Sequence, residues 1–287
     1  MGDKLRHVVF GTGQVGRTVA NRLAGSGMAV RAVSRRRPVG LATGVDWRRA
    51  DLTDPEAAID AAKGATVLYQ CLNARYAQRP KMFPPPQRTV LAAAERADAL
   101  LVTLENVYGY GPTGGRPLTE DLPLAAATSK GRVRAVMSEE LLAAAETGRI
   151  RVAIGRASDF FGAGVTESTL GSRVFGNAVA GKRADFIGNP DLLHTYSYVP
   201  DIATGLVTLR QVRSHVRDRD HPAGRRCQRH DRLVPDPRAD PMTSTRAPTF
   251  PASSPEVAWS HRVRKVGGYI QLAFAAFWLV RGGMSIT

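Results

Sequence analysis

A glycine-rich cluster near the amino terminus separates a short apolar run, residues 6–10, from a stretch with apolar residues at helical spacing, residues 15–24. The cluster consists of Gly11, Thr12, Gly13, Gln14, Val15 and Gly16. In a strand–loop–helix unit the first glycine permits a tight turn, the second lets the main chain approach a pyrophosphate, and the third lets the helix pack on the strand. Free N–H groups at the helix start favour an anion. The cluster therefore predicts a dinucleotide-binding unit, and the alternative is a glycine turn without a ligand.

Strand-like and helix-like patterns alternate from this cluster as far as residue 209. The predicted strands are 6–10, 29–34, 65–72, 99–104 and 150–155, with a further strand ending just before Asp51. The predicted helices are 15–24, 55–63, 87–96 and 133–147, and Thr53 and Asp54 are candidate caps of the second one. Strands alternating with helices of this length indicate βαβ units. We therefore predict an α/β fold with a Rossmann-type, doubly wound parallel sheet.

The pattern changes after Leu209. Residues 210–261 contain ten arginines, seven prolines and no lysine, and they keep neither helical nor strand periodicity. Two explanations stay open: a basic arm without a packed core, or a change of reading frame near Leu209 in a GC-rich gene, which we favour. The predicted divisions are an NAD(P)-binding Rossmann domain with part of the substrate region over 1–209, an irregular Arg/Pro-rich tail over 210–265, and a short apolar segment over 266–287. The C-terminal substrate region is thus expected to be truncated or irregular.

Charge and cysteine content narrow the class of protein. The net charge is +15, and residues 210–287 carry +8 of it, with 14 Lys and Arg against 6 Asp and Glu. No aromatic platform accompanies these arginines, so we expect no specific nucleic-acid partner, and no metal site is predicted.

Two cysteines, Cys71 and Cys227, are too few for a disulfide framework and indicate a reduced, cytoplasmic protein. The longest apolar run, 272–280, is shorter than the roughly 20 residues of a membrane span, so none is expected.

The end of the second predicted strand indicates which dinucleotide is bound. A site for NAD usually has an Asp or Glu there, on the ribose 2′-hydroxyl. This chain has Ser34, Arg35, Arg36 and Arg37 instead, and arginine binds phosphate in a bidentate, permanently charged way. We therefore predict NADP as the cofactor, with NAD as the second choice and a solvated basic turn as the alternative without a ligand.

Further residues are predicted to line the cofactor groove. Asp51 lies just past the third predicted strand, where it could accept from the adenine amino group; a plain capping carboxylate is the alternative. Asn73 follows the fourth predicted strand, and the carboxyl ends of such strands border the ligand crevice of an open α/β sheet. The predicted groove residues are Asp51, Leu52, Leu72 and Asn73.

Five segments carry a resemblance to a known family. They are Gly11–Gly16, Ala50-Asp51-Leu52, Val107-Tyr108-Gly109, Arg156–Gly164 (RASDFFGAG) and Tyr198–Ala203 (YVPDIA). Together they resemble the NAD-dependent epimerase/dehydratase family, an extended or atypical branch of the short-chain dehydrogenase/reductase superfamily, over about residues 5–209. The resemblance implies a small polar substrate, with sugar nucleotides as one class, and it allows a homodimer.

In that family hydride transfer relies on a Ser or Thr, a Tyr and a Lys; the tyrosine is the acid/base and the lysine lowers its pKa. Ser129 and Lys130 resemble the end of this motif. However, Ala126 stands at the tyrosine position and Leu104 at the Ser/Thr position. The candidate catalytic residues are then Lys130 and Tyr108, because the loop after the fifth predicted strand lies beside the ligand crevice. The alternatives are a structural tyrosine, as in the Val-Tyr-Gly of the family pattern, and a solvated lysine at the start of a helix.

Three hypotheses about function follow. The first is an NAD(P)-dependent oxidoreductase or epimerase/dehydratase-like enzyme whose usual Ser and Tyr positions are lost, with Tyr110 as a second phenol beside Tyr108. The second is a non-catalytic NADP-binding sensor or interaction module, motivated by Ala126 and Leu104. The third is a frameshifted gene product that keeps only its cofactor domain.

Overall fold

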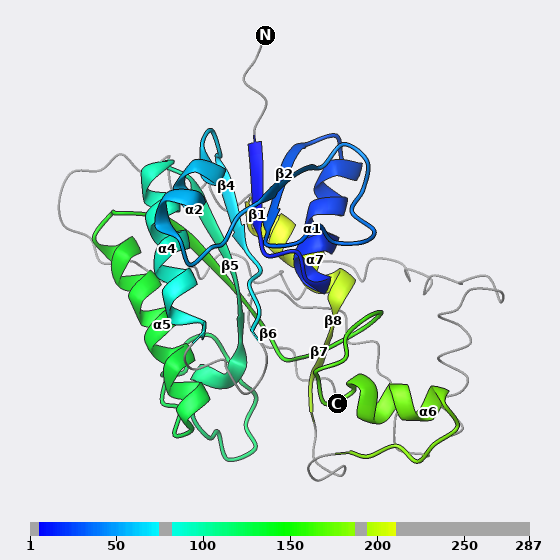
Figure 1. Ribbon diagram of the computed structural model, residues 1–287. Coiled ribbons are helices and arrows are strands. Elements are labelled where there is room, and N and C mark those ends of the chain that lie inside the picture. Colours follow the sequence, from blue (N-terminus) through cyan, green and yellow to red (C-terminus); the bar gives the residue numbers. More distant parts are fainter. Residues whose placement is uncertain (1–5, 75–81, 187–193, 211–287) are drawn as a thin grey trace, which may run out of the picture. The chain divides into compact units, whose positions relative to one another are not determined.

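The described part of the chain is built on a six-stranded parallel sheet (Figure 1). The computed structural model describes residues 6–74, 82–186 and 194–210, which belong to one compact unit. The strand order is β3-β2-β1-β4-β5-β6. The strands are β1 (Arg6–Phe10), β2 (Ala29–Ser34), β3 (Asp46–Arg49), β4 (Val67–Gln70), β5 (Leu100–Asn106) and β6 (Arg151–Ala157).

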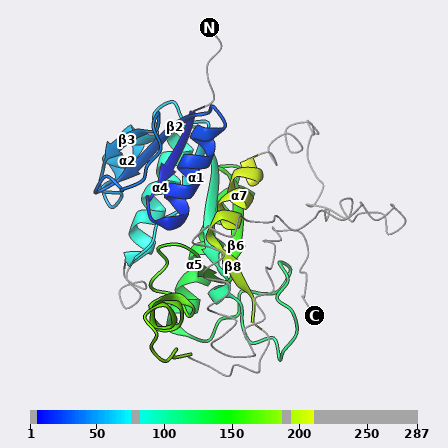
Figure 2. The ribbon, with the colours of Figure 1, turned by 90° about the vertical axis from the view of Figure 1, so that its right-hand side faces the viewer.

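Helices cover both faces of this sheet (Figure 1, Figure 2). One face carries α1 (Gln14–Gly25) and α7 (Val199–Leu209). The other face carries α2 (Pro55–Ala62), α4 (Pro84–Arg96) and α5 (Ser129–Glu146). This arrangement confirms the predicted Rossmann-type, doubly wound α/β fold.

Each face of the sheet has its own apolar core, because successive strand residues point to opposite sides. Val9 is fully buried in the cluster under α1 and α7, together with Leu23 of α1. Its neighbour Phe10 is fully buried in the cluster under α2, α4 and α5, together with Leu141 of α5. Burial on both faces explains why the sequence reads as apolar runs rather than as alternation.

A smaller parallel pair of strands follows β6. It consists of β7 (Asp159–Phe161) and β8 (Tyr196–Tyr198), and β8 leads directly into α7. The short helices are the 3-10 turn η2 (Val107–Gly109), the π-type turn η3 (Gly171–Gly176) and α6 (Asn177–Val179).

Local signals explain where two of the helices begin. The Asp54 carboxylate accepts from the N–H groups of Glu56 and Ala57, which confirms Asp54 as the cap of α2; Thr53 instead donates to Asp51. The Thr128 hydroxyl caps α5 by accepting from the N–H of Gly131. α5 therefore begins four residues before the predicted start at 133.

Two predictions about the rest of the chain fall on its carboxyl-terminal part. The irregular tail, apart from Arg210, and the apolar segment over 266–287 lie outside the described residues. Within the described ranges, none of the helices has the length and apolarity needed to cross a bilayer.

Candidate cofactor site

The glycine loop lies at the point where the order of the strands reverses. β1 pairs with β2 on one side and with β4 on the other, so the chain leaves β1 in one direction and returns on the opposite side. In open α/β sheets the ligand crevice forms beyond the carboxyl ends of the strands at this switch point. The loop after β1 and the residues after β4 are therefore the expected walls of a cofactor site.

The three glycines of the loop are in different surroundings. Gly11 has a φ of 90°, and a Cβ there would lie 2.7 Å from the carbonyl oxygen of Cys71. A Cβ on Gly16 would lie 1.9 Å from the carbonyl oxygen of Gly11. At Gly13, by contrast, nothing lies within 4 Å of such a Cβ. The loop is thus packed against backbone at both ends and bare in the middle, as a cradle for a diphosphate requires.

Two polar side chains of the loop are tied to other segments. The Thr12 hydroxyl donates to Ser34 Oγ at 2.8 Å, which links the loop to the end of β2. Gln14 Nε2 donates to the carbonyl oxygen of Gly164 at 2.6 Å, which brings the segment after β7 against the start of α1. Val15 points into the core and is 7% exposed. Of the predicted loop residues, Val15 can therefore contribute only backbone groups.

The residues predicted to hold the adenosine end lie around β2 and β3. Arg35 and Arg36 are exposed. Asp51 accepts from the N–H and the hydroxyl of Thr53; these bonds and the charge of Arg35 hold the pKa of its carboxyl below the usual value. Leu52 is buried in the core under α2 and α4.

Two predicted groove residues follow β4. Leu72 is half-buried and Asn73 is exposed. Cys71, directly before them, is buried, and this burial raises the pKa of its thiol to about 12, as suits a small core residue.

The close packing of α5 on η2 brings the main chain of Gly131, the residue after Lys130, against the carbonyl oxygen of Tyr108. A Cβ on Gly131 would lie 2.4 Å from the carbonyl oxygen of Tyr108, so only glycine fits next to Lys130. The N–H of Tyr108 donates to Asn106 Oδ1, so Asn106 is a loop cap. Ala126, at the position of the family tyrosine, donates its N–H to the carbonyl oxygen of Gly109 at 3.2 Å. The loop that carries Tyr108 and Tyr110 therefore lies directly against the segment in which Ala126 replaces the family tyrosine.

The Ser/Thr position offers no hydroxyl on the expected face. Leu104 packs against the apolar cluster under α1 and α7. Thr103 is fully buried, and as its neighbour in the strand it points to the opposite face.

A buried charge cluster at the end of β5 is visible only in the structure. Glu105 is 1% exposed and lies 3.4 Å from Arg134 of α5; burial raises the pKa of its carboxyl, although Arg134 and Arg156 oppose this. Arg156, in register with Glu105 on β6, donates to the Tyr110 hydroxyl at 3.0 Å. The cluster holds Tyr110 at the carboxyl edge of the sheet. In the sequence, the one sign of this cluster is an acidic residue near the end of an otherwise apolar strand.

A second polar cluster joins β7 to β8. Asp159 Oδ2 accepts from the Thr169 hydroxyl at 2.7 Å and lies 3.1 Å from His194 Nε2. The His194 ring lies tilted against the Tyr196 ring at 4.6 Å between centroids, and burial together with Asp159 raises the pKa of Tyr196 to about 12. No sequence pattern connected these residues, which are 35 positions apart.

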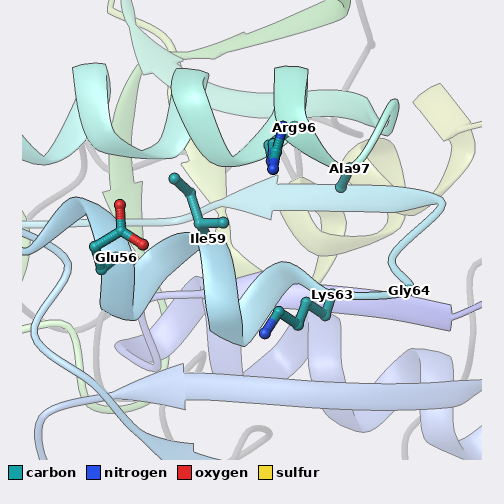
Figure 3. A pocket seen from close by; sticks show the side chains of 6 residues that line it. All are labelled: Glu56, Ile59, Lys63, Gly64, Arg96 and Ala97. Atoms are coloured by element: carbon teal, nitrogen blue, oxygen red, sulfur yellow. The ribbon is translucent and has the colours of Figure 1, made fainter.

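One hollow in the described surface lies away from the glycine loop and the carboxyl edge of the sheet (Figure 3). It is lined by Glu56, Ile59, Lys63, Gly64, Arg96 and Ala97, from α2, the end of α4 and the turns that follow them. None of these residues was predicted to bind the cofactor. The glycine loop, by contrast, lies at the start of a helix, where free N–H groups favour an anion.

Comparisons with known proteins agree with this geometry. The family model for the NAD dependent epimerase/dehydratase family matches residues 8–221, and the chain belongs to that family. No curated protein sequence matches the chain.

Solved structures share the fold. A presumed epimerase from Burkholderia cenocepacia J2315 is 26% identical, with 72% of this chain and 71% of that chain covered and a TM-score of 0.62. The UDP-glucose 4-epimerase from Brucella ovis, in complex with NAD, is 17% identical, with 74% of each chain covered and a TM-score of 0.63. The UDP-N-acetylglucosamine 4-epimerase from Bacillus cereus is 15% identical, with 72% of each chain covered and a TM-score of 0.62.

Proposed function

We propose that the chain binds a nicotinamide dinucleotide at the glycine loop and exchanges hydride with a small polar substrate. The observation that carries this proposal is the contrast within the loop, where Gly11 and Gly16 are packed against backbone and Gly13 is bare. Family membership and the Brucella ovis structure in complex with NAD support this class of cofactor. When bound, the nicotinamide ring supplies or accepts the hydride.

NADP is the proposed form of the cofactor. β2 ends in Ser34, and the next residues, Arg35 and Arg36, are exposed guanidinium groups at the expected place of a 2′-phosphate. Several structural neighbours are complexes with NAD, so the arginines of this chain, and not the likeness, favour NADP.

Other residues have proposed roles along the same groove. The N–H groups at the start of α1 would bind the diphosphate, with Gly13 giving access. Asp51 would accept from the adenine amino group, while Leu72 and Asn73 would line the ribose side. Lys130, in the first turn of α5, would contact the nicotinamide ribose.

Proton transfer to the substrate needs a group at the carboxyl edge of β5. Tyr108 is the proposed donor, because η2 places it against the turn of α5 that holds Lys130. Sugar nucleotides are the proposed substrate class, since several neighbours are UDP-sugar epimerases.

Cofactor titration and a turnover assay together separate this enzyme from a binding module without turnover. The module is favoured by Ala126 at the tyrosine position and by the half-buried Leu104 at the Ser/Thr position. We expect the fluorescence of NADPH to show saturable binding at micromolar concentrations. The affinity for NADPH should be higher than the affinity for NADH. Interconversion of UDP-glucose and UDP-galactose, or NADP⁺ reduction with UDP-glucose, would establish the enzyme. Tight NADPH binding without turnover of any UDP-sugar would favour the module, and no binding of either cofactor would end both proposals.

We also propose a cytoplasmic location and a homodimer. The buried, unpaired thiol of Cys71 suits a reducing compartment. Cell fractionation and light scattering on the purified chain would test the location and the mass.

A further inference from the structure

The Ser34 hydroxyl sits at the junction of three segments. It donates to the carbonyl oxygen of Arg36 at 2.8 Å, accepts from the Thr12 hydroxyl at 2.8 Å and accepts from the indole N–H of Trp47 at 3.1 Å. These directions are forced, because a carbonyl oxygen only accepts and an indole N–H only donates. Since the single Ser34 proton goes to Arg36, Thr12 must be the donor in the bond between the two hydroxyls.

This hydroxyl has no capacity left for a ligand. A serine hydroxyl has one donor and two acceptor positions, and all three are occupied here. The proton of Thr12 is also used, in its bond to Ser34. Neither side chain can donate to a phosphate without first breaking a bond inside the protein, so the charged donors at the end of β2 are the guanidinium groups.

The same three bonds set the course of the arginine turn. The bond from Ser34 to the Arg36 carbonyl closes the chain around Arg35. The bond to Thr12 attaches this turn to the glycine loop, and the bond to Trp47 attaches it to β3. The Arg35 charge then acts on Asp51, which Thr53 holds in place.

We infer that Ser34 is a positioning residue for cofactor choice: it holds Arg35 and Arg36 for the 2′-phosphate without touching the phosphate itself. This inference rests on the proposed function, since it assumes that NADP binds at this loop. A direct ligand contributes to binding whether or not the neighbouring groups are present. The effect of a positioning residue, by contrast, disappears once the groups that it positions are removed.

The first experiment compares NADPH and NADH affinities by fluorescence titration of the full chain. Ser34→Ala should lower the ratio of NADPH to NADH affinity about tenfold, as expected for the loss of an ordering hydrogen bond at a charged contact. Ser26→Ala, which removes a hydroxyl bond at the far end of α1, should leave the ratio unchanged. An equal loss for both cofactors would overturn the inference, because a general loosening of the site does not distinguish them.

The second experiment repeats Ser34→Ala in an Arg35→Ala, Arg36→Ala background. We expect no further change in the affinity ratio there, whereas an additive loss would make Ser34 a direct ligand and overturn the inference. If Ser34→Ala does not fold, Trp47→Phe is judged by the same rule, since it removes one of the three bonds and keeps an aromatic ring. Wild-type protein that binds neither cofactor refutes the proposed function. Wild-type protein that binds NADPH while Ser34→Ala keeps its selectivity refutes only this inference.

Discussion

Gly16 lies so close to Gly11 that a Cβ on Gly16 would be 1.9 Å from the Gly11 carbonyl oxygen. No side-chain rotation relieves such a contact, because the Cβ position is fixed by the backbone and the obstacle is itself backbone. Gly11 is confined in turn by the carbonyl of Cys71 and by its φ of 90°. The loop is thus determined by contacts between main-chain segments, and its middle residue, Gly13, is free of them.

This difference predicts opposite phenotypes for two alanine variants. Gly16→Ala should destabilise the fold by several kcal/mol, since overpacking against rigid backbone displaces α1 from β1. Gly13→Ala should change stability by less than about 1 kcal/mol, because its φ of −66° suits alanine and the space around it is empty. If the loop binds a diphosphate, Gly13→Ala should nevertheless weaken NADPH binding at least about tenfold.

Urea unfolding and NADPH titration of the same preparations measure both quantities. Gly25→Ala serves as the control, since its Cβ also meets nothing within 4 Å but lies at the other end of α1. Undiminished NADPH affinity in Gly13→Ala would count against this loop as the diphosphate site.

The fold was accessible from the sequence because its strands are buried on both faces. β1 and β5 read as apolar runs, and the glycines between β1 and α1 mark the turn. β3 carries a single apolar residue, Trp47, so its place followed only from the residues after it. Such patterns depend only on residues that are close in the sequence. The order of strands and helices along the chain can therefore be predicted from them.

The bonding of the site was not accessible in the same way. The sequence places Ser34 with the arginines of the cofactor site, yet the partners that occupy its hydroxyl include residues from segments 22 and 13 residues away. Glu105 and Arg156 meet because β5 and β6 pair in one particular register. Such contacts depend on which way each side chain points at the end of a strand, and residue identity alone does not determine this.

The Glu105–Arg134 pair makes a prediction about stability. Arg134 is 11% exposed and its guanidinium lies 3.8 Å from the Phe83 ring centroid, so Arg134→Leu should leave the Glu105 carboxylate buried without this partner. We expect a loss of about 3 kcal/mol, with partial recovery in the Glu105→Gln, Arg134→Leu double variant. Urea unfolding of the double-mutant cycle measures the coupling. Arg88→Leu breaks an exposed pair between α4 and α5 and should cost less than about 1 kcal/mol; equal losses at the two sites would contradict this account.

Lys130 makes a prediction about cofactor binding. It lies in the first turn of α5, against the loop of Tyr108, so Lys130→Met should weaken NADPH binding about tenfold if its ammonium group contacts the nicotinamide ribose. Lys182→Met, at an exposed position beyond α6, should have no effect. Fluorescence titration measures both, and thermal melting checks that α5 is intact. Wild-type affinity in Lys130→Met would remove this lysine from the proposed site.

His7 predicts how stability depends on pH. It is fully buried on β1, with Nδ1 3.3 Å from the Tyr69 hydroxyl, and burial together with the charge of Arg210 lowers its pKa from 6.5 to about 4. Between these two pH values the unfolded chain binds more protons than the folded chain. The stability that comes from keeping His7 neutral is therefore fully present above pH 6.5 and is lost as the pH falls toward 4. Urea unfolding should show a loss of about 2 kcal/mol from this group between pH 7.5 and pH 5. His7→Gln removes the titration, and its stability should fall less over the same range; parallel pH profiles for the two proteins would mean that folding leaves the pKa of His7 unchanged.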